Sequence, residues 1–126
     1  MNSLQAERRI RRGDIAALRR ALAAGFDVRA PDRYGWTLLM TAAQEGRVEI
    51  CRLLIDHGAP IDLPNKVGET ALSLAAHAGK AECVRWLLAS GAPKSCRPHG
   101  SSLLDWTRRT SGLPREQLDR IMNLIG

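Results

Sequence analysis

Residues 35–46 read Gly-Trp-Thr-Leu-Leu-Met-Thr-Ala-Ala-Gln-Glu-Gly, and residues 68–79 read Gly-Glu-Thr-Ala-Leu-Ser-Leu-Ala-Ala-His-Ala-Gly. The two stretches begin 33 residues apart, and aligning Asp32–Pro64 on Asn65–Arg97 gives twelve identities in 33 positions without a gap. The same step separates two series of glycines: Gly13, Gly46 and Gly79, and Gly25, Gly58 and Gly91. Self-similarity at this period is the sequence signature of a repeat architecture, in which each unit packs only on its neighbours.

Each unit is predicted to form a helix, a tight turn, a second helix and a loop. Thr37 is a suitable N-cap, since its hydroxyl can accept a hydrogen bond from a free amide of the first helical turn. Apolar residues then recur at helical spacing up to Gly46, which can end the helix in the left-handed conformation. A second apolar helix follows and ends at Gly58. Residues 59–68 contain two prolines, an asparagine and a glycine, so we expect an extended turn there.

With these segments in place, the chain resembles the ankyrin repeat family. The resemblance rests on the 33-residue period, on the two twelve-residue stretches quoted above, and on the helix endings at residues 53–59 and 87–92. The family's Thr-Pro-Leu-His signature is only partly kept, because Leu38 and Ala71 stand in place of its proline, and Met40 and Ser73 in place of its histidine. The resemblance implies an all-α solenoid of helix-turn-helix units joined by extended β-turn or hairpin loops.

The pattern continues toward both ends in degraded form, as expected of capping units. Upstream, residues 4–10 and 15–22 match the two helices, with Arg9 and Ile10 at the positions of the Ala42-Ala43 pair. Downstream, residues 100–108 follow the start of a unit one residue early, with Thr107 and Arg108 at those positions. A final helix is predicted over Pro114–Ile125, with an apolar face of Leu118, Ile121, Met122 and Ile125. The chain is thus one domain with units at 1–31, 32–64, 65–97 and 98–126.

Composition agrees with a folded globular domain that has no membrane-spanning segment. The chain has 126 residues, of which 44% are hydrophobic and 25% charged, which argues against disorder. No stretch approaches the ~20 apolar residues of a membrane helix. Three cysteines cannot all pair within one chain, and the basic N-terminus lacks the apolar run of a secretion signal, so we expect a cytoplasmic protein.

The resemblance implies a protein-binding surface on the concave face, made by the loop tips and the first helices. We therefore expect a non-enzymatic module that is monomeric alone and binds an unidentified partner protein, as a small inhibitor, immunity or adaptor protein would. The family's contact positions fall on these residues of the chain: Arg11, Arg12, Arg33, Tyr34, Trp36, Gln44, Glu45, Lys66, Val67, Glu69, His77 and His99.

Tyr34 and Trp36 stand out among these positions. The chain has five aromatic residues, and two lie in one short turn where core packing does not require them. Large aromatics on a rigid loop are typical interface anchors. The alternative is that Trp36 folds back over the neighbouring loop and only shields it. Trp86 and Trp106 fall on apolar helix faces, and we expect both in the core.

No catalytic or metal site is predicted, and no cofactor or small-molecule substrate is expected. His57, His77 and His99 have no carboxylate or nucleophile at a spacing that suggests a relay. Cys96 and His99 could supply two metal ligands, whereas a closed zinc site needs four. Cys51 and Cys83 lie on helices and are expected to be buried as small hydrophobic residues, with Cys96 exposed.

The charge distribution leaves one alternative open. The formal net charge is +6, and the excess of basic residues lies toward the two ends of the chain. Six arginines form a basic ridge near the N-terminus: Arg8, Arg9, Arg11, Arg12, Arg19 and Arg20. The ridge is either a solubilising cap or a binding site for an acidic protein, with nucleic acid and anionic membrane less favoured because no reading motif accompanies it. Salt sensitivity separates these, since phosphate binding weakens steeply with ionic strength.

Overall fold

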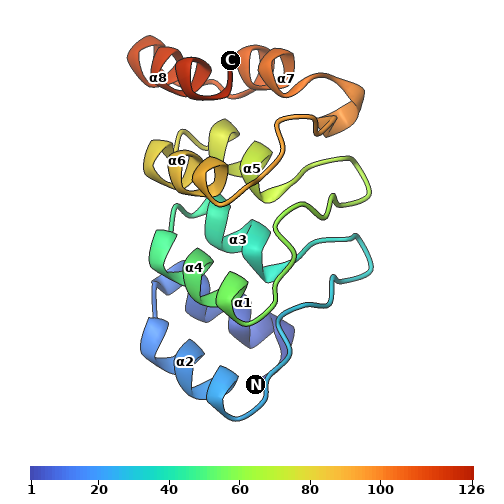
Figure 1. Ribbon diagram of the computed structural model, residues 1–126, viewed down its shortest axis with the longest axis vertical. Helices are drawn as coiled ribbons and strands as arrows, with labels where there is room; N and C mark the ends of the chain where they lie inside the picture. Colours follow the sequence, from blue (N-terminus) through green and yellow to red (C-terminus); the bar gives the residue numbers. More distant parts are fainter.

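The computed structural model describes residues 1–126 as eight α-helices and one short 3-10 turn, without a strand (Figure 1). The elements are α1 (Ser3–Arg12), α2 (Ile15–Ala23), α3 (Leu38–Gln44), α4 (Val48–Asp56), α5 (Ala71–His77), α6 (Ala81–Ala89), η1 (Pro98–Gly100), α7 (Leu103–Thr110) and α8 (Arg115–Ile125). The predicted all-α solenoid is confirmed. None of these helices has the length and apolar character that crossing a membrane requires.

The helices form four pairs stacked along one axis, with the loops projecting to one side (Figure 1). Helices α1, α3, α5 and α7 are the first of each pair, and α2, α4, α6 and α8 the second. Through the first three units, successive first helices pack more closely than successive second helices do, whereas α6 packs on α8 about as closely as α5 packs on α7. Closer packing on one side of a stack makes that side the inner side of its curve. We call the surface formed by the first helices and the loop tips the inner face.

Local sequence sets the helix ends as predicted. The hydroxyl of Thr37 accepts a hydrogen bond from the Met40 amide at 3.2 Å and caps α3, and Thr70 caps α5 in the same way through Ser73. The Ser73 hydroxyl in turn accepts from the Thr70 amide at 2.8 Å. Gly46 then leaves α3 with φ of 72°, a left-handed conformation that costs a glycine little.

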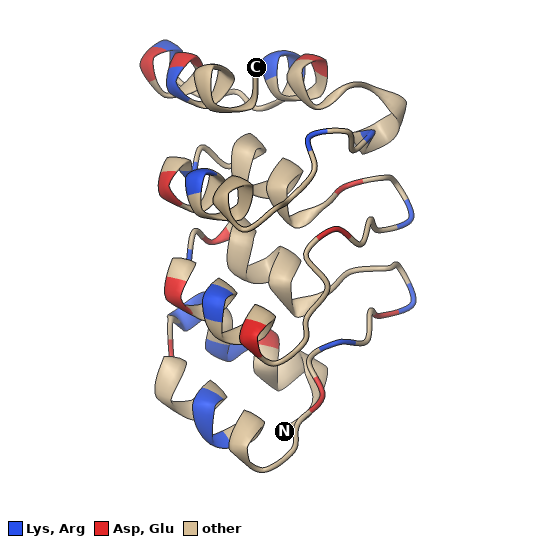
Figure 2. Cartoon of the chain, in the orientation of Figure 1, with Lys and Arg blue, Asp and Glu red and all other residues tan.

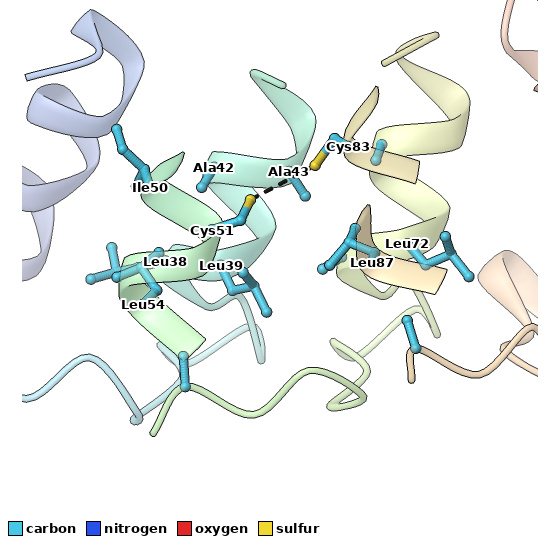
Figure 3. Close-up of a cluster of buried hydrophobic side chains, with 14 of the residues drawn as sticks. Leu38, Leu39, Ala42, Ala43, Ile50, Cys51, Leu54, Leu72, Cys83 and Leu87 are labelled. Atoms are coloured by element: carbon cyan, nitrogen blue, oxygen red, sulfur yellow. Dashed lines mark hydrogen bonds between the residues drawn. The ribbon is translucent and has the colours of Figure 1, made fainter. Parts of the chain in front are cut away.

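The core lies between the stacked pairs. Four leucines at matching positions of the two central units are almost completely buried: Leu39, Leu54, Leu72 and Leu87. Ala42 and Ala43 point to opposite sides of α3, Ala42 toward the first unit and Ala43 toward the third (Figure 3). Both are completely buried, so their small side chains allow the first helices to approach on either side.

The terminal units keep this pattern on one side only. In α1, Arg9 is exposed and Ile10 is buried, whereas in α7 Thr107 is buried and Arg108 is exposed. Each arginine therefore stands at the position that has no neighbouring unit. Thr107, by contrast, is completely buried, since its position faces the preceding unit.

Helix α8 closes the C-terminal end of the stack. It packs on α6 and α7, and it buries Ile121 and Ile125, while Leu118 and Met122 on the same face are half-buried. The helix begins at Arg115, one residue later than predicted, because Pro114 has an extended backbone (φ −55°, ψ 149°) and serves as the N-cap residue.

Candidate protein-binding surface

Each loop tip is built around one polar side chain that receives two backbone amides. The Asp32 carboxylate accepts hydrogen bonds from the amides of Tyr34 at 2.8 Å and Trp36 at 2.9 Å. One unit later, the Asn65 side-chain oxygen accepts from the amides of Val67 at 3.1 Å and Glu69 at 2.9 Å. Satisfied amides of this kind fix the shape of a tight turn.

Neighbouring tips are also joined to one another. The Lys66 amide donates to the Tyr34 carbonyl at 3.0 Å, and the His99 amide donates to the Val67 carbonyl at 2.6 Å. The loops approach so closely that a Cβ added at Gly35 would lie 2.9 Å from the Asn65 Cα. The row of tips is therefore a hydrogen-bonded surface of fixed spacing.

Tyr34 is the most exposed aromatic side chain of this row. It is 58% exposed, and the guanidinium of Arg33 lies 4.9 Å from its ring centroid. Val67 follows on the next tip and is 46% exposed. Two large apolar side chains thus face solvent on adjacent, fixed tips.

Trp36 behaves differently from Tyr34. It is half-buried, its indole N–H donates to the Thr41 hydroxyl at 2.7 Å, and it packs on a small group of buried side chains. That group consists of Met40, Leu74 and Trp106, and it is separate from the main core; we call it the inner cluster. The expectation that packing does not require Trp36 is therefore wrong, because the indole covers one end of the inner cluster.

Trp106 forms the other end of the inner cluster. Its indole stacks with the imidazoles of His77 and His99, at centroid distances of 4.5 and 5.6 Å. His99 also lies 3.1 Å from a carboxylate oxygen of Glu69, whose other oxygen accepts from the Asn65 side chain at 2.8 Å. Trp106 is buried as predicted, although it lies in the inner cluster rather than in the main core.

Sequence reasoning missed the inner cluster. The available signal was that Thr41 and Leu74 occupy equivalent places in their units, and that Trp106 follows them once the one-residue offset of the last unit is counted. Trp86 lies elsewhere, on second helix α6. It is half-buried against the main core, and the Arg52 guanidinium lies 6.0 Å from its ring centroid.

The loop tips carry basic residues, with acidic residues close by in the same loops (Figure 2). Arg33 and Lys66 form no ion pair within the chain. The nearby carboxylates of Asp32 and Glu69, by contrast, are engaged in the hydrogen bonds described above. Each tip therefore carries one cationic and one carboxylate side chain, and the cations of Arg33 and Lys66 lie beside the exposed apolar groups Tyr34 and Val67.

The remaining predicted positions lie along the ends of the first helices. Gln44, Glu45 and His77 are half-buried, and Arg12 is exposed. Arg11 forms an ion pair with Glu45 at 2.7 Å, which joins α1 to the end of α3. These residues form a polar border beside the inner cluster.

The six N-terminal arginines do not all face solvent freely. Arg9 pairs with Asp14 at 3.1 Å and Arg11 with Glu45, while the Arg11 carbonyl accepts from Arg47 at 2.8 Å. Arg19 and Arg20 belong to α2, a second helix. Arg8 and Arg12 are left exposed and unpaired on α1. The ridge expected from sequence is thus divided between two helices and partly neutralised.

The three cysteines and His57 lie in surroundings that account for them by packing or by local hydrogen bonding. Cys51 and Cys83 are completely buried as predicted, but Cys96 is half-buried rather than exposed, and burial raises the pKa of its thiol. His57 ends α4 and places its Nδ1 atom 2.9 Å from the Leu53 carbonyl oxygen. No group of three or more His, Cys, Asp or Glu side chains is arranged to hold a metal ion.

Comparison with known proteins identifies the fold family. The family model described as "Ankyrin repeats (3 copies)" matches residues 8–97. The chain belongs to the ankyrin repeat family. Ankyrin repeats are generally protein–protein interaction modules and are typically non-enzymatic.

Two curated relatives illustrate the similarity. A protein of Mustela putorius furo named "Ankyrin repeat, SAM and basic leucine zipper domain-containing protein 1" is 47% identical over 47 residues, which is 37% of this chain and 10% of that protein. The "2-5A-dependent ribonuclease" of Mus musculus is 43% identical over 51 residues, 40% of this chain and 7% of that protein. The similarity therefore spans about a tenth or less of these relatives.

Proposed function

We propose that this ankyrin repeat domain is a non-enzymatic module that binds a partner protein on its inner face, with Tyr34 as the main anchor. The observation that carries the proposal is the placement of Tyr34, a 58% exposed aromatic ring on a tip fixed by Asp32 and by the next loop. Aromatic side chains are enriched among the residues that dominate binding energy, and truncating one often costs ~2 kcal/mol or more.

The fixed tips support this function on energetic grounds. Ordering a mobile loop on binding costs free energy, and a preformed loop avoids most of that cost. Trp36 contributes to binding mainly by fixing the first tip. Its hydrogen bond to Thr41 and its packing on the inner cluster hold the base of that tip in place. Val67 continues the apolar contact onto the second tip.

The charges of the inner face indicate the chemistry of the partner surface. Arg33 and Lys66 are unpaired beside Tyr34 and Val67. A partner that carries carboxylates around an apolar patch would match this arrangement, and such complementarity orients a complex and raises its association rate. The polar border, together with Glu69 and His99 at the tips, would then surround the contact.

In this role the domain acts by occupying, sequestering or bridging its partner, as a small inhibitor, immunity or adaptor protein does. We propose that it works as a monomer in the cytoplasm. The competing hypothesis, an acidic partner on the N-terminal arginines, is weakened because Arg9 and Arg11 already have carboxylate partners.

The test is affinity capture from a lysate of the native host, identified by mass spectrometry at low and moderate salt. Wild type is compared with Tyr34→Ala and with Arg85→Ala, a control at an exposed position on second helix α6. The proposal predicts a protein that wild type and Arg85→Ala retain at moderate salt and Tyr34→Ala loses. Capture that Tyr34→Ala leaves unchanged and moderate salt abolishes would contradict it and favour the arginine ridge.

A further inference from the structure

Two buried thiols meet across the interface between the second and third units. Cys51 lies on α4 and Cys83 on α6, and their sulfur atoms are 3.7 Å apart (Figure 3). Both residues have an exposed fraction of 0%. Neither thiol contributes to the inner face, so the proposed binding surface gives the pair no role.

The spacing of the two cysteines explains the contact. They are 32 residues apart, one fewer than the repeat length, so they do not occupy equivalent positions. Cys83 is equivalent to Ile50, which points back toward the first unit in Figure 3, and Cys51 is equivalent to Val84. Cys51 therefore points forward and Cys83 backward, and they meet in the space between the units.

We propose that Cys51 and Cys83 are a dithiol–disulfide site, at which hydrogen peroxide introduces a covalent cross-link between the second and third units. The site is distinct from the inner face and does not depend on the proposed function. It assigns to the two cysteines a chemical role beyond that of small buried side chains.

The geometry requires little movement. A disulfide has a sulfur–sulfur distance of about 2.0 Å, so the two atoms must approach by about 1.7 Å. Both sulfur atoms already point toward each other from adjacent helices (Figure 3).

The thiol–thiol contact also distinguishes the two sulfurs. A hydrogen bond from Cys51 lowers the pKa of Cys83, against the opposing effect of burial. The same hydrogen bond, together with burial, raises the pKa of Cys51. Since the thiolate is the nucleophile, this difference favours Cys83 as the sulfur that attacks the peroxide.

The reaction balances with peroxide as the two-electron oxidant. The Cys83 thiolate attacks one peroxide oxygen, the O–O bond breaks, and hydroxide leaves to give a sulfenic acid. The Cys51 sulfur then attacks the Cys83 sulfur, the S–S bond forms, the S–O bond breaks, and the departing hydroxide takes the Cys51 proton as water. Overall, two thiols and one hydrogen peroxide yield one disulfide and two waters.

Access to the buried site follows from the architecture. Units of a solenoid contact only their neighbours, so one interface can open without unfolding the whole chain. Hydrogen peroxide is close to water in size and needs only a small opening. A bulky thiol reagent needs a larger one, so it should react far more slowly with the folded protein.

The test uses the full chain with Cys96→Ser, which removes the third thiol, and a matched variant that also carries Cys51→Val. Valine is the residue that the third unit has at the equivalent position, Val84, so this control keeps the packing of the repeat. Each protein is treated with hydrogen peroxide at equal concentration. The readouts are intact mass, thiol titration after unfolding, peptide mapping and thermal melting.

The proposal predicts that the dithiol protein loses two hydrogen masses and both thiols, and yields a single linked peptide containing Cys51 and Cys83. It should melt about 10 °C higher after oxidation, and a reductant should reverse the change. The Cys51→Val control should show no such rise. Thiols that stay intact, or that only gain oxygen without linking, would overturn the proposal, as would a cross-link between chains.

Discussion

The imidazole of His77 stacks on the indole of Trp106 at a centroid distance of 4.5 Å, with the ring planes inclined by 25°. His77 ends α5 and Trp106 lies in α7, so the stack joins the third unit to the last one. At this interface Thr107 stands where the central units have the first alanine of their pair. The aromatic contact therefore helps to hold the last unit against the third unit at the inner face.

Replacing Trp106 by alanine should therefore destabilise the fold strongly. The side chain is 7% exposed and touches both histidines, so its loss leaves a cavity between two units. We expect the free energy of unfolding to fall by about 3–4 kcal/mol in urea denaturation. Trp86→Ala is the matched comparison and should cost about half as much, since Trp86 is only half-buried. Equal losses would contradict the assigned packing.

Replacing Gly35 by alanine should cost stability for two reasons: backbone strain at a positive φ, and a steric clash of the added Cβ with the next loop. Gly25→Ala has only the first cost, so comparing the two variants separates them. Gly35 and Gly25 both have a positive φ, 78° and 93°, so either substitution costs about 1 kcal/mol in backbone strain. Only at Gly35 does the added Cβ meet backbone, 2.9 Å from the Asn65 Cα, whereas nothing lies within 4 Å at Gly25. Chemical denaturation should show a clearly larger loss for Gly35→Ala. If Gly25→Ala cost as much, the close packing of the loop tips would be wrong.

A stabilising change is predicted at the start of α6. Asp14 caps α2 by accepting a hydrogen bond from the Ala17 amide at 3.1 Å, but the equivalent Lys80 makes no side-chain cap bond. The two backbones agree closely, with φ and ψ of −81° and 75° at Asp14 and −86° and 76° at Lys80. Lys80→Asp should add about 1 kcal/mol to the free energy of unfolding, and Lys80→Ala should not. A Lys80→Asp protein no more stable than Lys80→Ala would count against this cap geometry.

Removing residues 113–126 should expose the last interface. Ile121 and Ile125 of α8 are buried where the helix packs on α6 and α7, and the Leu113 side chain covers Gly79. The shortened chain should melt at a lower temperature or aggregate on heating, because an apolar face loses its cover. Light scattering during a thermal melt would report either outcome. A truncated chain that melts like the full one would refute the capping role of α8.

Much of the fold follows from the sequence because its signals are local. Thr37 caps a helix through an amide three residues away, and Gly46 ends it through its own backbone freedom. The 33-residue period then places the same capping threonine and helix-ending glycine in the next unit, at Thr70 and Gly79. The start of α8 was placed one residue too early, since an extended backbone at Pro114 also satisfies the preference of proline.

The site was less predictable because its contacts join distant residues. Nothing local indicates that Trp36 packs on Leu74 and Trp106, or that two histidines stack on Trp106. The meeting of Cys51 and Cys83 required counting their 32-residue spacing against the repeat length. Exposure of Tyr34 was expected from its position in the turn, whereas burial of Trp36 depends on the first helices of later units.

The central claim, that the inner face binds a protein partner, is tested most directly by site-specific photocrosslinking in the native host. A photoreactive benzoylphenylalanine replaces Tyr34 in one version of the chain and Arg85 in another, and cells are irradiated before denaturing purification. Our account predicts a discrete adduct with one partner protein from position 34 and none from position 85. The same adduct from both positions, or an adduct from position 85 alone, would contradict it.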